Sequence, residues 1–95
     1  MSENQANARE LEERAWVEAE LSHEVREEPA WNILELWRSE TPLGEGLSGE
    51  ALEKLVLRDL DAMRDKPEGE TMASWAERFE MPYAYACALD TYLTL

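Results

Sequence analysis

Hydrophobic residues recur along this chain at helical spacing, and no stretch alternates between apolar and polar residues as a half-buried β-strand would. The clearest pattern lies between residues 48 and 64. There one helix face is predicted to hold Leu52, Leu55, Val56, Leu60 and Met63. Ser48 is a suitable N-cap for this helix. The pattern therefore predicts a helix that begins directly after Ser48.

The same spacing, together with breaks at Pro and Gly, predicts five helices. They cover about residues 6–27, 29–39, 49–64, 72–79 and 82–93. The predicted fold is all-α, a single small domain of four to five helices. Within it we expect an acidic helical arm (1–40), a linker (41–47) and a compact helical core (48–95).

The first predicted helix separates apolar from acidic residues. Its apolar arc is expected to contain Leu11, Ala15, Leu21 and Val25. An acidic stripe lies on the opposite side and consists of Glu13, Glu20, Glu24 and Glu27. Trp16 lies beside this stripe, as an aromatic anchor rimmed by charge would at a protein interface. The other three tryptophans, Trp31, Trp37 and Trp75, have the spacing of core residues.

The last predicted helix is apolar nearly all round, which is typical of a central core helix or of an interface. Its candidate interface residues are Tyr83, Tyr85, Leu89 and Tyr92. Cys87, the only cysteine, is interpreted as a small core residue.

The net charge of −13 indicates which kinds of partner this protein can bind. Residues 1–40 hold eleven acids and four bases, and residues 41–95 hold eleven and five, so the whole fold is acidic. Such a protein repels nucleic acid and anionic membranes and attracts basic protein surfaces. With no apolar run of membrane-spanning length, a polar N-terminus and one cysteine, we expect a cytoplasmic protein.

Candidate chemistry is sparse. His23 lies one turn from Glu20 and Glu27, but an acidic helix produces such spacing by chance. No phosphate-binding glycine loop and no nucleophilic triad is present. We therefore expect no enzyme activity, no cofactor and no metal site.

Residues 71–93 resemble a helix-turn-helix segment. The resemblance rests on Ala76, Phe79, Met81, Ala86 and Leu89. Glu80 stands where that family usually has Gly. The outward residues of the second helix are expected to be Pro82, Tyr83, Ala84, Tyr85, Cys87 and Ala88. None of them pairs bidentately with a base edge, so the recognition helix is degenerate.

In size and charge the chain is similar to small acidic phage inhibitors, including DNA-mimic antirestriction proteins and anti-CRISPR proteins, with no shared motif. The first hypothesis is accordingly an inhibitor that blocks a basic, nucleic-acid-handling protein by acidic mimicry. The alternative is a small regulatory or assembly adaptor that dimerises through residues 82–95 and whose acidity only keeps it in solution.

Overall fold

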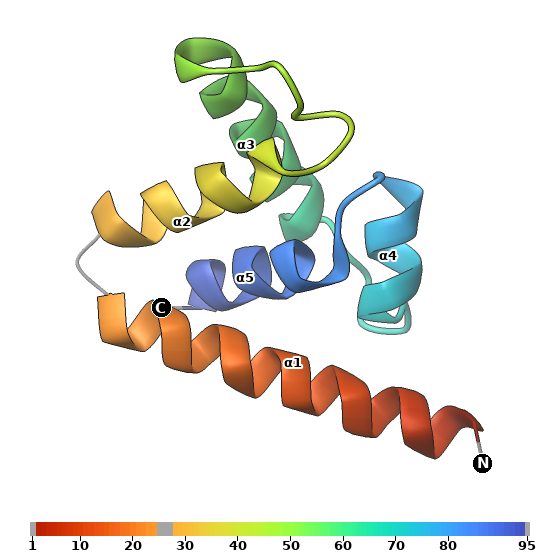
Figure 1. Cartoon of the computed structure of the whole chain (residues 1–95). Helices are drawn as coiled ribbons and strands as arrows, with labels where there is room; N and C mark the ends of the chain where they lie inside the picture. Colours follow the sequence, from red (N-terminus) through yellow and green to blue (C-terminus); the bar gives the residue numbers. More distant parts are fainter. Residues whose placement is uncertain (1, 25–27, 95) are drawn as a thin grey trace.

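The computed structural model is all-α, as predicted, and its described residues form five helices in one small domain (Figure 1). It describes the backbone of residues 2–24 and 28–94, and the side chains of residues 8–23 and 30–94. The helices are α1 (Ser2–Glu24), α2 (Glu28–Ser39), α3 (Gly49–Arg64), α4 (Met72–Arg78) and α5 (Tyr83–Thr94).

Helix α5 is the centre of the fold and packs against each of the other four helices. Figure 1 shows α1 running beneath it, α2 and α3 above it, and α4 at its N-terminal end. Five consecutive residues of α5 are buried, Tyr85, Ala86, Cys87, Ala88 and Leu89. A helix that is apolar on all sides is stable only when neighbours cover all sides. The sequence predicted either a central core helix or an interface, and the structure shows the central core helix.

The two predicted N-cap residues, Thr71 and Ser48, differ in whether they make a capping hydrogen bond. Thr71 caps α4, because its side-chain oxygen accepts a hydrogen bond of 3.1 Å from the backbone N–H of Ser74. Ser48 precedes α3 as predicted, but its side chain makes no capping hydrogen bond. The helix begins there nevertheless, because the apolar face with Leu52, Val56 and Leu60 is buried in the core.

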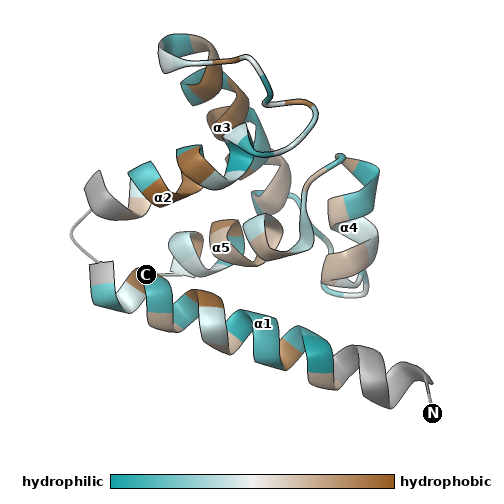
Figure 2. Cartoon of the chain, viewed as in Figure 1, coloured by the Kyte–Doolittle hydropathy of each residue, from teal (hydrophilic) through white to brown (hydrophobic). Residues whose placement is uncertain are grey.

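The buried face of α1 differs from the predicted one. Leu11 is 68% exposed and Ala15 is also exposed. Leu21 is fully buried as predicted, and Val17, which lies outside the predicted arc, is fully buried too. The predicted Val25 lies outside the described residues. The helix is thus rotated so that its acidic side comes closer to the core than the apolar arc suggested. Figure 2 shows hydrophilic residues along much of the described part of α1.

Polar contacts explain this rotation. Arg14 forms an ion pair with Asp90 of α5. One turn earlier, a carboxylate oxygen of Glu10 accepts a hydrogen bond of 3.3 Å from the backbone N–H of Met72, at the start of α4. A carboxylate at a helix N-terminus is favourably placed. The N-terminal half of α1 is thus held by charged side chains, which a hydrophobic pattern does not register.

The segments predicted as arm and linker belong to the same core as the rest of the chain. Val17, Leu21 and Leu34 lie in one hydrophobic cluster with the buried residues of α3, α4 and α5. In the predicted linker, Thr41 and Gly44 are buried.

No helix in the described residues is long and apolar enough to cross a membrane.

Candidate functional site

The turn between α4 and α5 has an unusual backbone conformation at Glu80. Its φ angle is +56°, in the left-handed region that favours glycine. Two contacts hold this turn: the N–H of Met81 donates to the carbonyl of Ala76 at 2.8 Å, and Nη1 of Arg38 donates to the carbonyl of Glu80 at 3.0 Å. The strained residue is therefore anchored by a side chain from α2.

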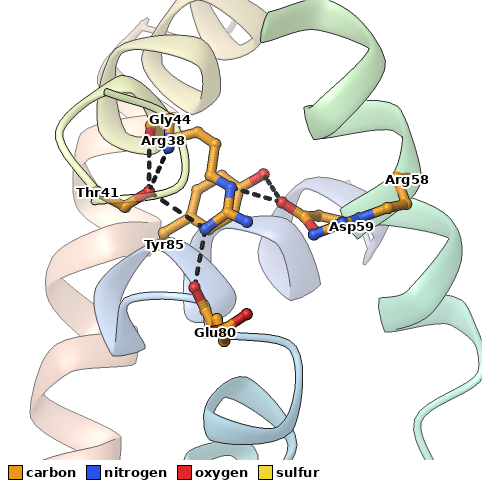
Figure 3. Close-up of polar contacts among 7 residues, drawn as sticks. All are labelled: Arg38, Thr41, Gly44, Arg58, Asp59, Glu80 and Tyr85. Carbon is orange, nitrogen blue, oxygen red and sulfur yellow. Dashed lines mark hydrogen bonds and ion pairs between the residues drawn. The ribbon is translucent and has the colours of Figure 1, made fainter. Parts of the chain in front are cut away.

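Arg38 belongs to a buried polar cluster that joins α2, α3 and α5 (Figure 3). Arg38 and Asp59 are both 0% exposed, and Nε of Arg38 lies 2.9 Å from Oδ2 of Asp59. That N–H is not directed at the oxygen, so the contact is an ion pair without a hydrogen bond. The Tyr85 hydroxyl donates to the same Oδ2 at 2.9 Å, and Nη2 of the exposed Arg58 reaches Oδ1 at 3.1 Å. Asp59 thus accepts hydrogen bonds from Tyr85 and Arg58 and forms a buried ion pair with Arg38.

Tyr85 remains a hydrogen-bond donor over the whole physiological range. Burial of its ring, reinforced by the charge of Asp59 and by their hydrogen bond, raises the pKa of the Tyr85 phenol well above its ordinary 10.0. The Arg38 guanidinium also lies over the Tyr85 ring, 5.4 Å from its centroid. The cluster therefore carries the charges of the arginines and Asp59, and none on the tyrosine.

A tight turn after α2 completes the surroundings of Arg38. The Thr41 hydroxyl donates to the carbonyl of Arg38 at 2.9 Å and accepts the N–H of Gly44 at 3.1 Å. A Cβ at position 44 would lie 2.0 Å from the carbonyl oxygen of Arg38. Only glycine allows this approach, so the segment predicted as a linker is a fixed structural turn.

Sequence reasoning missed this cluster, although a signal for it exists. At 100° per residue, Asp59 falls inside the apolar arc that Leu55, Val56 and Met63 form on α3. Arg38 likewise falls between Trp31 and Leu34 on α2. Two opposite charges, each within an apolar face, indicate a buried pair, because neither is tolerated there alone.

A pocket of about 580 Å³ opens beside this cluster. Its floor includes the buried Tyr85 and Met81, and its walls include Trp16 of α1 and Trp37 of α2. Glu40 and Glu80, both exposed, also line it. Residues from α1, α2, the α4–α5 turn and α5 thus meet around one concave site.

Trp16 is 50% exposed and stacks on Trp37, with ring centroids 5.4 Å apart and an angle of 13° between the planes. The sequence predicted an exposed anchor beside the acidic stripe. The exposure of Trp16 agrees with this prediction, and the structure also places Trp16 in the lining of a pocket together with Trp37 of α2. Trp37 packs against the core, as do Trp31 and Trp75, in agreement with the prediction for these three.

The acidic stripe is described only in part. Glu13 is half-buried, with 27% of its side chain exposed, and forms an ion pair with Arg9 at 3.4 Å. Glu20 is exposed. The side chain of Glu24 and all of Glu27 lie outside the described residues. Of the two described members, Glu20 is therefore the more accessible carboxylate.

The predicted interface residues of α5 separate into two groups. Tyr83 and Tyr92 are half-buried, whereas Tyr85 and Leu89 are 1% and 0% exposed. Tyr85 and Leu89 therefore serve the core and offer no free surface. The expected outward positions Tyr85, Cys87 and Ala88 are all buried, because four helices pack on α5.

Groups for metal binding or nucleophilic chemistry are dispersed. His23 is exposed on α1, and no group of three or more His, Cys, Asp or Glu in the described part of the chain is placed to hold a metal ion. Burial, followed by the nearby charge of Glu13, raises the pKa of the Cys87 thiol to about 11. A buried, protonated thiol is a poor nucleophile.

The sequence matches no protein-family model and no curated protein, and the fold matches no solved structure.

Proposed function

We propose that this protein is a non-enzymatic inhibitor that binds a basic, nucleic-acid-handling protein and blocks its nucleic-acid groove by acidic mimicry, in the manner of antirestriction or anti-CRISPR proteins. One observation carries the proposal. At least seven of the nine Lys and Arg residues form ion pairs within the chain, so few positive charges are left to balance the 22 acids. The surface is thus more uniformly negative than the composition alone requires.

The unbalanced carboxylates lie on several sides of the fold. Exposed acids that make no ion pair with another described side chain are Glu12, Glu20, Glu40, Glu45, Glu53, Asp65, Glu68, Glu77 and Glu80. Lys and Arg side chains that evolved to bind phosphates also bind carboxylates through charge-assisted hydrogen bonds. A surface of this kind supports competition with nucleic acid for a basic cleft.

The helix-turn-helix-like segment supports protein binding better than DNA binding. Direct readout needs polar side chains on an exposed helix that enters a groove, together with cationic phosphate contacts. Helix α5 contains no Lys or Arg, and half of its twelve residues are buried. The role of this segment in the proposal is to position the central helix and the pocket beside it.

The experiment begins with a pull-down from the native host and then titrates the partner with this protein at rising salt, with and without the partner's nucleic acid. Mimicry predicts that affinity falls steeply with ionic strength and that nucleic acid competes. A quadruple Glu→Lys variant at Glu13, Glu20, Glu24 and Glu27 is expected to abolish binding with its helical circular dichroism retained. A second quadruple variant reverses Glu45, Glu53, Glu68 and Glu77, which lie outside α1, and changes the net charge by the same amount. A smaller loss of binding in this variant would assign the effect to the α1 stripe, and an equal loss would assign it to the total negative charge. Salt-independent binding that nucleic acid does not compete for would exclude mimicry.

The adaptor alternative is favoured by one separate observation, four exposed leucines in and around the α2–α3 connection: Leu36, Leu43, Leu47 and Leu57. In the interface first expected for this alternative, residues 82–95, the described residues 82–94 comprise six buried, six half-buried and one exposed. Self-association through the leucines would be insensitive to salt. Sedimentation of the wild type and of Leu36→Ser and Leu57→Ser variants measures it, and a monomeric wild type at high concentration removes the homodimeric form of the adaptor hypothesis.

A further inference from the structure

We propose that the pocket between Trp16, Trp37, Glu40 and Glu80 receives one arginine side chain of a protein partner. The inference rests on the proposed function only for the source of that arginine. The recognition chemistry itself lies in the described residues, and a small molecule can test it without any partner.

The two indole rings provide the first element of recognition. They stack on each other, with centroids 5.4 Å apart and 13° between the planes, so a guanidinium does not fit between them. Trp16 nevertheless is 50% exposed and lines the pocket. An arginine guanidinium is planar and stacks on an aromatic face, where the ring quadrupole attracts its charge. Lysine has a compact, strongly hydrated charge and stacks less well. The exposed indole of Trp16 therefore favours arginine over lysine.

The two carboxylates provide the second element. Glu40 and Glu80 are exposed, line the pocket, and make no ion pair with another described side chain. Glu80 is held in place by the hydrogen bond between its carbonyl and Arg38. A carboxylate binds a guanidinium through two parallel N–H···O bonds, a geometry that ammonium cannot reproduce.

The buried cation beneath the pocket does not cancel this preference. Arg38 is 0% exposed, and its charge is offset by Asp59 at 2.9 Å. Tyr85, which belongs to the cluster and also lines the pocket, stays neutral because burial raises its pKa. The two glutamates thus determine the sign of the charge at the pocket mouth. The volume of about 580 Å³ is within the usual range of ligand sites and accommodates one long side chain.

The test titrates the full-length protein, labelled with ¹⁵N, with Nα-acetyl-arginine amide and observes the four tryptophan indole N–H signals by NMR. We expect the Trp16 and Trp37 signals to move and the Trp31 and Trp75 signals to stay. Nα-acetyl-citrulline amide has the same shape without the charge and should shift nothing. Nα-acetyl-lysine amide should bind more weakly than the arginine probe.

Three variants assign the interaction to its parts. Glu40→Gln and Glu80→Gln keep the size and backbone of each residue, and each should weaken the arginine probe by roughly two- to fivefold. Trp16→Ala removes one aromatic wall and should weaken it by a similar factor. Glu53→Gln changes an exposed acid of α3 outside the pocket and should leave the affinity unchanged.

The proposal is overturned if citrulline or inorganic phosphate shifts Trp16 and Trp37 as arginine does, if lysine binds as tightly as arginine, or if no indole signal moves. Failure here is distinguishable from failure of the inhibitor proposal. A partner bound in a salt-sensitive manner with equal affinity by wild type and Trp16→Ala would keep the mimicry and remove the pocket. If the pocket binds arginine but the protein has no basic partner, the pocket proposal stands and the inhibitor proposal fails.

Discussion

Two ion pairs in this molecule have the same chemistry and opposite surroundings. Arg38 and Asp59 lie 2.9 Å apart with both side chains 0% exposed, whereas Lys54 and Glu50 lie 3.7 Å apart with 74% and 83% exposed. Desolvated charges depend on each other, because either one alone in the interior is costly. Exposed charges are solvated whether paired or not and contribute little.

This contrast divides the charges of the protein by role. The interior pair joins α2 to α3, and through Tyr85 and the Glu80 carbonyl it reaches α5 and the strained turn. The exposed pairs mainly neutralise bases at the surface and leave the remaining carboxylates in excess. Function is therefore expected to respond to changes at surface acids, and stability to changes in the interior pair.

The largest effect is expected for Asp59→Ala. It leaves the Arg38 charge buried without its carboxylate and removes the acceptor of the Tyr85 hydroxyl. Breaking one side of a buried pair costs about 3–5 kcal/mol, so urea unfolding should show a loss of this size, or fail to show a folded state. The double variant Arg38→Met/Asp59→Leu replaces both charges and should recover much of the loss. A single variant within about 1 kcal/mol of wild type would contradict the structural role of the pair.

The second prediction compares the interior thiol with the same thiol in the unfolded chain. The Cys87 pKa is raised from 9.0 to about 11. At pH 8 the thiolate fraction should be roughly 100-fold below that of the unfolded chain, and alkylation by iodoacetamide slower by at least that factor. Between pH 9 and about pH 11, the thiol pKa values of the unfolded and folded chain, the folded state retains a proton that the unfolded state has lost. The free energy of unfolding therefore falls as the pH rises through this window. Equal alkylation rates in buffer and in concentrated urea would place Cys87 at the surface.

The same division explains how much the sequence could predict. Helical periodicity located all five helices to within a few residues and predicted the core role of Trp75 and Cys87, because apolar burial drives both. It failed on α1, where Leu11 is exposed and where Arg14 and Glu10 make the contacts. The hydrophobic pattern gives no weight to charged side chains that pack.

The candidate site was predictable only in fragments. Trp16 was singled out as functional, but its partner Trp37 lies 21 positions later and was predicted as core. Glu40 and Glu80 are ordinary exposed acids in the sequence and meet only because the turns after α2 and α4 converge. A site assembled from several elements has no local spacing, so periodicity does not find it.

A third, smaller effect is expected at Gly44, where interior packing meets the loop. Gly44→Ala places a methyl group 2.0 Å from the Arg38 carbonyl oxygen, so backbone must move. Overpacking of this kind costs about 1–3 kcal/mol in the free energy of unfolding, measured by urea titration. Gly46 has open space but φ of +85°, and Gly69 has open space without that restriction. Gly69→Ala is therefore the control and should stay near wild type. Equal stabilities of the two variants would mean that the 41–47 turn adjusts freely.

The smallest effect is expected for the exposed pair on α3. Lys54→Ala removes the partner of Glu50 and should change the free energy of unfolding by no more than about 0.5 kcal/mol, because both side chains are mostly solvated. High salt should reduce even this difference, since it screens exposed charges. The double variant Glu50→Ala/Lys54→Ala completes a thermodynamic cycle that isolates the pair. A coupling energy above about 1 kcal/mol would show that surface charges also stabilise this fold, and the division between structural interior charge and functional surface charge would then fail.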